Sequence, residues 1–203
     1  MEKVFSSKNA LKAWRYVRSW VIFIALLIVL RYTGMLAGIS YVTGNVIMRT
    51  GLMDAKHKKT VAAKKFNYNF RIRDLNGEII RVNDFKGKTV FLNLWATWCG
   101  PCRLEMPSIE KLYQQVDKEK IVFIILSVDR PQDINKVKSY IAEEEFSFPV
   151  FTPADFLPNQ LQVKSIPATF IVGPDGSIVS TEVGATNFDT PEFRDFLEGI
   201  QAE

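Results

Sequence analysis

A pair of cysteines placed where a buried strand should meet a helix constrains this chain more than any other feature. Residues 88–95 form a mostly apolar run of strand length, and Trp-Cys-Gly-Pro-Cys follows at residues 98–102. Beyond it, apolar residues recur at helical spacing, at Ile109, Leu112, Tyr113 and Val116. The order predicts a strand, then a helix that has Cys99 at its N-terminal cap and Cys102 in its first turn.

The position of the two cysteines indicates redox chemistry. At a helix N-terminus, unpaired backbone N–H groups and the positive end of the helix dipole stabilise an anion, so Cys99 is expected to form a thiolate readily. The Cys102 sulfur can reach back to close a disulfide with Cys99. Pro101 is suited to the start of the helix, because the backbone N–H that proline lacks would have no partner within the helix there. We therefore predict Cys99 as the attacking thiol and Cys102, which is less exposed, as the thiol that resolves a mixed disulfide.

Three other interpretations of the cysteine pair are weaker. A purely structural disulfide would contribute little, because stabilisation by a disulfide grows with the length of the loop that it closes. A zinc site would need a second pair of ligands, and the chain has no further cysteine and one histidine, His57. Inert buried thiols would have no need of the cap position. We predict neither a metal nor a cofactor.

The rest of the chain from residue 66 onward alternates between strand and helix patterns. Two runs of β-formers, at residues 69–74 and 78–82, flank an Asn-Gly turn at 76–77 and predict a hairpin. Further elements are expected as a strand at 121–128, a helix that starts near Pro131, a short helical patch at 155–161, strands at 168–172 and 177–183, and a last helix capped by Thr190 with Pro191 at its first position. This pattern predicts an α/β fold with a mixed sheet flanked by helices.

The formal net charge of +4 is the sum of two unlike parts. Residues 1–65 carry twelve Lys and Arg and two acidic residues, for a net charge of +10. Residues 66–203 carry fourteen basic and twenty acidic residues, for a net charge of −6. Nucleic-acid binding depends on a basic surface, so the acidic part is a poor candidate for that function.

The basic N-terminal part is typical of a membrane anchor. Five basic residues between positions 3 and 18 precede Trp20 and an apolar run at residues 21–30. Basic residues before an apolar run keep the N-terminus in the cytoplasm. We expect an uncleaved transmembrane helix over about residues 16–36, with a cleaved signal peptide or a buried helix of the globular domain as alternatives. The expected organisation is a tail and anchor at 1–53, a linker containing His57 at 54–65, and a globular domain at 66–203.

Two segments carry a resemblance to a known family. Residues 91–107, which read FLNLWATWCGPCRLEMP, and the later Ser-Ile-Pro-Ala-Thr-Phe at 165–170 resemble the thioredoxin superfamily. More narrowly, they resemble the membrane-anchored TlpA/ResA-like thiol-disulfide oxidoreductases. The resemblance covers about residues 66–203. It implies a thioredoxin fold with an additional N-terminal β-hairpin and with a central insertion at residues 131–145.

The resemblance also implies roles for particular residues. Cys99 matches the nucleophile, Cys102 the resolving thiol, and Pro167 a cis-proline that faces the cysteines. A cis bond would expose the backbone of Ile166 to an extended substrate peptide, whereas an ordinary trans proline at the start of a strand is the alternative. The expected contacts of the substrate are Trp98, Gly100, Pro101 and Ile166.

Deprotonation of Cys102 requires a proton acceptor, for which the sequence offers two candidates. Asn93 occupies the position at which cytosolic thioredoxins have a buried acid, so another group must act here. Glu105, in the helix after the motif, and Asp129, at the carboxyl end of a parallel strand, are the candidates. The alternative for Glu105 is a first-turn acid favoured by the helix dipole. Trp95 is expected in the core.

The preferred function is thiol-disulfide exchange on the extracytoplasmic (periplasmic) side of the cell membrane. The resemblance suggests reduction of protein disulfides, for example in cytochrome c maturation, with a membrane electron donor that restores the dithiol. Two alternatives are a thiol peroxidase of the peroxiredoxin type and a non-catalytic, anchored peptide-binding module. The spacing of the two cysteines and the presence of Pro167 disfavour the peroxidase.

Overall fold

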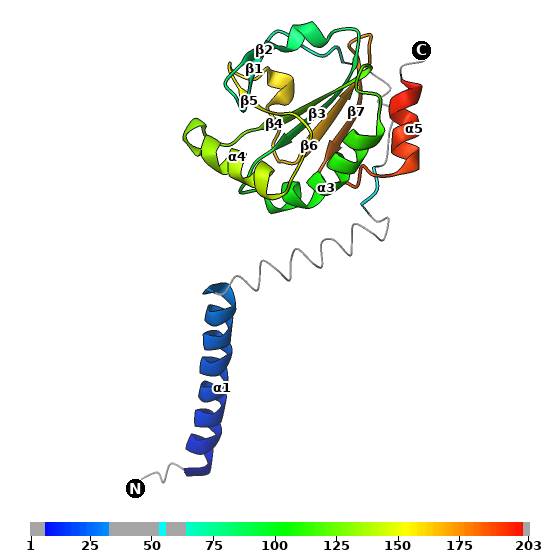
Figure 1. Cartoon of the computed structure of the whole chain (residues 1–203). Coiled ribbons are helices and arrows are strands. Elements are labelled where there is room, and N and C mark those ends of the chain that lie inside the picture. Colours follow the sequence, from blue (N-terminus) through cyan, green and yellow to red (C-terminus); the bar gives the residue numbers. More distant parts are fainter. Residues whose placement is uncertain (1–6, 33–52, 56–63, 201–203) are drawn as a thin grey trace. The chain divides into compact units, whose positions relative to one another are not determined.

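The computed structural model describes residues 7–32, 53–55 and 64–200. The chain divides into two units, and the division falls between residues 46 and 47. The first unit contains the helix α1 (Ser7–Tyr32), and the second contains a sheet with helices packed on it (Figure 1).

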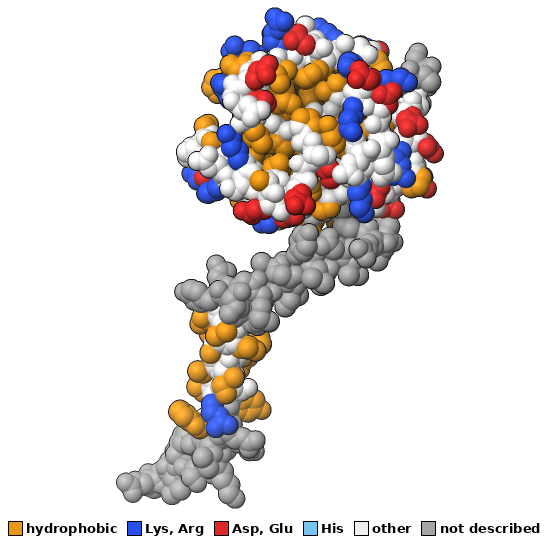
Figure 2. Space-filling view, in the orientation of Figure 1, with side chains coloured by type: hydrophobic (Ala, Val, Ile, Leu, Met, Phe, Trp, Pro, Cys, Tyr) orange, Lys and Arg blue, Asp and Glu red, His pale blue; other side chains and the backbone are white. Residues whose placement is uncertain are grey.

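Helix α1 is 26 residues long, and its described side chains are mostly apolar and exposed (Figure 2). In the part of the chain that the structure describes, no helix is both long and apolar enough to cross a bilayer. The predicted transmembrane helix at 16–36 extends into residues 33–36, which lie outside the described residues, as does His57 of the predicted linker.

The second unit is built on a seven-stranded mixed sheet with the order β2-β1-β5-β4-β3-β6-β7. The central strand β3 pairs in parallel with β4 and antiparallel with β6. The strands are β1 (Arg71–Asp74), β2 (Ile79–Arg81), β3 (Thr89–Trp95), β4 (Ile121–Ser127), β5 (Val150–Pro153), β6 (Ala168–Val172) and β7 (Ile178–Val183). The prediction of an α/β fold with a mixed sheet is therefore confirmed.

Strand β3 is buried on both faces of the sheet, since all of its residues are buried and successive side chains point to opposite sides. Phe91 and Trp95 belong to one core cluster, with α3 (Gly100–Gln115), α4 (Ile134–Glu143) and α5 (Pro191–Gly199). Val90, Leu92 and Leu94 belong to the other, which is covered by residues 66–70 and by the 3-10 helices η1 (Val82–Phe85) and η3 (Asn159–Leu161). An apolar run without alternation is what a strand buried on both faces requires.

Local signals account for the ends of several elements. Gly77 adopts a φ of 98° in the turn between β1 and β2, a conformation that favours glycine over other residues. At the other end of the chain, Thr190 caps α5, since its Oγ1 accepts a hydrogen bond from the N–H of Phe193 at 3.1 Å. The helix predicted near Pro131 begins with the 3-10 turn η2 (Pro131–Asp133) and continues as α4.

Two details differ from the prediction. The helical patch expected at 155–161 is limited to η3, because Pro158 disfavours a helical conformation at Leu157 and Asp155 is held by Arg71. The strand β5 was not predicted. It is only four residues long and ends in Pro153, so its pairing with β1 and β4 rather than a local pattern makes it a strand.

Candidate active site at the start of helix α3

The two cysteines lie where the central strand gives way to α3. Cys99 has an extended backbone and is the N-terminal cap, and its Sγ accepts a hydrogen bond from the N–H of Cys102 at 3.2 Å. Pro101 lies in the first turn, where no donor is lost. The predicted placement at a strand-to-helix junction is confirmed.

Cys99 and Cys102 form a disulfide, and the two sulfurs differ in exposure. Residue Cys99 is 5% exposed, whereas Cys102 is fully buried in the core cluster that packs against α3. Cys99 is thus the more exposed of the two, and the order of attack and resolution stays a prediction.

A hollow of about 550 Å³ lies beside Cys99, between the start of α3 and the segment before β6. The predicted contacts Trp98, Gly100, Pro101 and Ile166 all line it, and Trp98 is 70% exposed. The Ile166–Pro167 peptide bond is cis, as predicted, and the carbonyl oxygen of Ile166 lies 3.8 Å from Cys99 Sγ. The structure thus brings the predicted cysteine, proline and backbone groups to one place.

Glu105 lies in the interior, one turn after Cys102 on α3. Its carboxyl is fully buried and accepts hydrogen bonds from Asn93 Nδ2 at 2.7 Å and from the N–H of Thr186 at 3.1 Å. Burial raises the pKa of Glu105 to about 8, although these two hydrogen bonds oppose the increase. The interpretation of Glu105 as a first-turn acid favoured by the helix dipole is wrong, because α3 begins at Gly100, its first turn contains no acidic residue, and the Glu105 side chain is buried in the core.

Asp129, the other candidate acid, follows β4 and holds the segment that leads into the cysteines. Its Oδ2 accepts hydrogen bonds from the N–H of Thr97 at 2.8 Å and from Ser127 Oγ at 2.8 Å, and its Oδ1 accepts one from Thr97 Oγ1 at 2.6 Å. These contacts fix the loop two residues before Cys99. They place Asp129 beside the site, where its role is to hold the loop in position.

Sequence reasoning missed several residues that hold the site. Thr97 could have been inferred from its position next to the cysteine motif. Thr169, whose Oγ1 accepts a hydrogen bond from Asn93 Nδ2 at 2.9 Å, and Thr186 had no local signal, because their partners are 76 and 81 residues away in the chain. Within the described ranges, no cluster of three or more His, Cys, Asp or Glu side chains could hold a metal ion.

A mixed sheet, a disulfide that opens a helix and a cis-proline against the accessible sulfur define a thioredoxin-like protein. The chain belongs to the AhpC/TSA family, whose sequence pattern matches residues 55–181. It is 34% identical over 117 residues to the thiol-disulfide oxidoreductase ResA of Bacillus cereus, a match that covers 57% of this chain and 66% of that protein. The ResA protein of Halalkalibacterium halodurans is 31% identical over 136 residues, which are 66% of this chain and 75% of that protein.

The match to the first of these relatives thus spans slightly less than two thirds of its length. Among solved structures, StoA from Bacillus subtilis superimposes with a TM-score of 0.51 at 21% identity, over 64% of this chain and 94% of that one. At this level of identity the likeness concerns the fold.

Proposed function

We propose that this protein catalyses thiol-disulfide exchange through Cys99 and Cys102. The observation that carries the proposal is the Cys99–Cys102 disulfide at the N-terminus of α3, with only Cys99 at the hollow beside Ile166. The similarity to the ResA oxidoreductases supports it. An accessible sulfur at a helix N-terminus and a second sulfur behind it are the two parts that such an exchange requires.

The exchange begins from the reduced protein. The Cys99 thiolate attacks one sulfur of a substrate disulfide, which joins Cys99 to the substrate and releases the other substrate sulfur as a thiolate. The thiolate of Cys102 then attacks Cys99 Sγ. This breaks the mixed disulfide, releases the second substrate thiolate and forms the Cys99–Cys102 disulfide. Two electrons pass from the protein to the substrate, and an external dithiol must supply them again.

Glu105 is proposed to accept the proton that Cys102 loses. Both groups are on α3, and Glu105 follows Cys102 by one turn. A carboxyl with a pKa of about 8 is matched to an ordinary thiol, whose pKa is about 8.5, so the proton moves between them at little cost. Asp129 is assigned the role of holding the loop before Cys99, on the strength of its bonds to Thr97.

The substrates are proposed to be protein disulfides, with apocytochrome c as the candidate that the family resemblance suggests. The hollow beside Cys99 is open to solvent. The Trp98 ring can pack against an extended peptide, and the backbone of Ile166 can form hydrogen bonds with it. Reduction is the proposed direction, since Gly100 and Pro101 resemble the pair between the cysteines of reducing thioredoxins.

A trapping experiment tests the activity and identifies its substrates. In Cys102→Ser, the mixed disulfide formed by Cys99 has no resolving thiol, so adducts with client proteins should accumulate and disappear on treatment with dithiothreitol. Cys99→Ser is the matched control and should form none. If Cys102→Ser yields no more adducts than Cys99→Ser, the site holds peptides without reacting with them.

Two further measurements test the direction and the type of reaction. A reduction potential close to that of thioredoxin, about −270 mV, agrees with a reductant, whereas a value near −120 mV would make the protein an oxidant. Consumption of hydrogen peroxide that is lost in Cys99→Ser would instead identify a thiol peroxidase.

We also propose that residues 1–53 anchor the protein in the cell membrane and leave the thioredoxin-like unit on the extracytoplasmic side, where a membrane donor reduces it. The basic residues before the apolar run at 21–30 and the opposite charge of the rest of the chain support this arrangement. Extraction of membranes at alkaline pH should leave the full-length protein in the pellet, and protease added outside should degrade the unit that contains Cys99. Release into the supernatant would contradict the anchor.

A further inference from the structure

Residues 53–55 pair with the loop that joins β7 to α5. Asn187 donates its backbone N–H to the carbonyl of Met53 at 2.7 Å, and its carbonyl accepts from the N–H of Ala55 at 3.2 Å. The Asn187 side chain adds a bond, from Nδ2 to Asp54 Oδ1 at 2.8 Å. This three-residue segment, which we call the strap, is thus joined to one loop residue by three hydrogen bonds.

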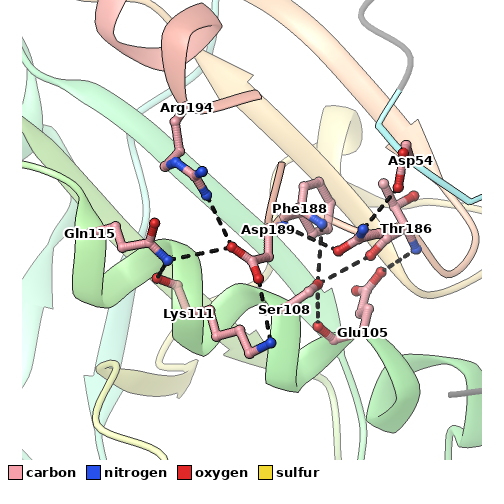
Figure 3. A network of polar contacts seen from close by, with 10 residues as sticks. Asp54, Glu105, Ser108, Lys111, Gln115, Thr186, Phe188, Asp189 and Arg194 are labelled. Atoms are coloured by element: carbon pink, nitrogen blue, oxygen red, sulfur yellow. Dashed lines mark hydrogen bonds and ion pairs between the residues drawn. The ribbon is translucent and has the colours of Figure 1, made fainter. Parts of the chain in front are cut away.

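The same loop, residues 184–190, reaches the buried carboxyl of the active site (Figure 3). Thr186, next to Asn187, donates its N–H to Glu105 Oε2 at 3.1 Å. Two residues further on, the N–H of Phe188 is donated to Ser108 Oγ at 3.1 Å, and Ser108 Oγ in turn donates to the carbonyl of Glu105 at 2.7 Å. The loop therefore binds the side chain of Glu105 directly and is linked to its backbone through Ser108.

Ion pairs fasten the far end of the loop to the two neighbouring helices. Asp189 lies 3.4 Å from Lys111 Nζ on α3 and 3.0 Å from Arg194 Nη1 on α5. Its backbone N–H is donated to Asn187 Oδ1 at 3.2 Å. Asn187 is consequently the residue at which the strap, the loop and this ion-pair cluster meet.

We propose that the strap positions the Thr186 N–H on the Glu105 carboxyl, with Asp54 and Asn187 as positioning residues. The inference rests on the proposed function only in the role given to Glu105. In the described residues, the Glu105 carboxyl accepts hydrogen bonds from Asn93 on β3 and from Thr186 in the loop, and none of the groups that shift its pKa carries a charge. Among the described residues, the Thr186 N–H is therefore one of two donors that stabilise the carboxylate.

The strap is thereby joined through Asn187 and Thr186 to the buried Glu105. Because an N–H donor favours the charged form of a carboxyl, loosening the loop should make Glu105 harder to ionise. The strap would in this way adjust the pH at which Cys102 can pass on its proton.

The test is a titration of Glu105 in the full-length, disulfide-bonded protein. The side-chain carboxyl is followed by its ¹³C chemical shift in protein labelled at glutamate, and its signal is assigned by its loss in Glu105→Gln. In Asp54→Ala and in Asn187→Ala, the midpoint should rise by about 0.5 to 1 pH unit. Asp54→Asn keeps an acceptor oxygen for Asn187 and should restore the original midpoint.

Lys65→Ala is the matched control, because it also removes an attachment of the N-terminal side of this unit. Lys65 Nζ lies 2.9 Å from Asp175 Oδ2 and 3.0 Å from Ser177 Oγ, both of which precede the loop in the chain. A midpoint that stays constant or falls in the two alanine variants, or that moves equally in Lys65→Ala, would overturn the inference. The titration needs no substrate, so its result is independent of the trapping experiment.

Discussion

At the scale of single residues, folding makes the ionisation of the Glu105 carboxyl unfavourable. Its pKa is about 8 in the folded protein, because of burial, against a usual value of 4.5. Between these two pH values the folded state binds more protons than the unfolded state, so stability is highest below pH 4.5 and declines as the pH rises toward 8. Over this pH range the free energy of unfolding should fall by about 3–5 kcal/mol. We expect Glu105→Gln to abolish this decrease.

Urea unfolding of the disulfide-bonded protein at a series of pH values measures this effect. Glu198→Gln, at an exposed position of α5, is the control and should retain the decline of the wild type. A slope between pH 4.5 and 8 that survives in Glu105→Gln would show that another group is responsible.

At the scale of elements, Glu110 joins α3 to the segment that leads into β5. Its carboxylate accepts hydrogen bonds from Ser147 Oγ and from the N–H groups of Ser147 and Phe148. Burial alone would raise the pKa of Glu110, but the bonds from Ser147, Gln114 and Phe148 outweigh it and lower the pKa. Its contribution to stability is therefore present above the usual pKa of 4.5 and is lost as the pH falls below it.

We expect Glu110→Ala to destabilise the protein by about 1–3 kcal/mol at neutral pH, because it leaves the N–H of the buried Phe148 without a partner and removes the bonds from Ser147. Denaturant unfolding at pH 7 checks the value. Gln114→Ala removes only a donor to Glu110 from an exposed position and should cost less than about 1 kcal/mol. Equal effects of the two substitutions would argue against this role of Glu110.

Local patterns predicted the elements whose ends are marked by nearby residues. Strand β3, helix α3 and helix α5 follow from an apolar run, a cysteine cap and a Thr-Pro start. Strand β5 did not follow, because four residues ending in proline carry too weak a pattern and depend on pairing with distant strands. The proton acceptor candidates were found as residue types, but nothing local showed that Glu105 is buried and that Asp129 is bound to Thr97.

At the scale of the whole molecule, an aromatic cluster around Phe91 joins the sheet to the C-terminal part of the chain. The Phe91 ring stacks on Phe123, with centroids 4.7 Å apart, and lies 5.1 Å from Phe188 and 6.3 Å from Phe193. Phe91 is fully buried, so Phe91→Ala should cost about 3–5 kcal/mol in calorimetry or urea unfolding. Phe156, which is 100% exposed, is the control, and Phe156→Ala should change stability by less than about 0.5 kcal/mol.

The sequence by itself determined the chemistry and the broad architecture of this protein. The apolar run, the cysteine spacing and the helix caps are local, and their physical consequences follow from backbone hydrogen bonding and periodicity over a few residues. The tertiary structure alone decided what surrounds the sulfurs and Glu105. Thr186 lies 81 residues from Glu105, and Asn187 lies 133 residues from Asp54. Such contacts form only when the sheet brings distant segments together, because burial and hydrogen bonding depend on the whole folded core.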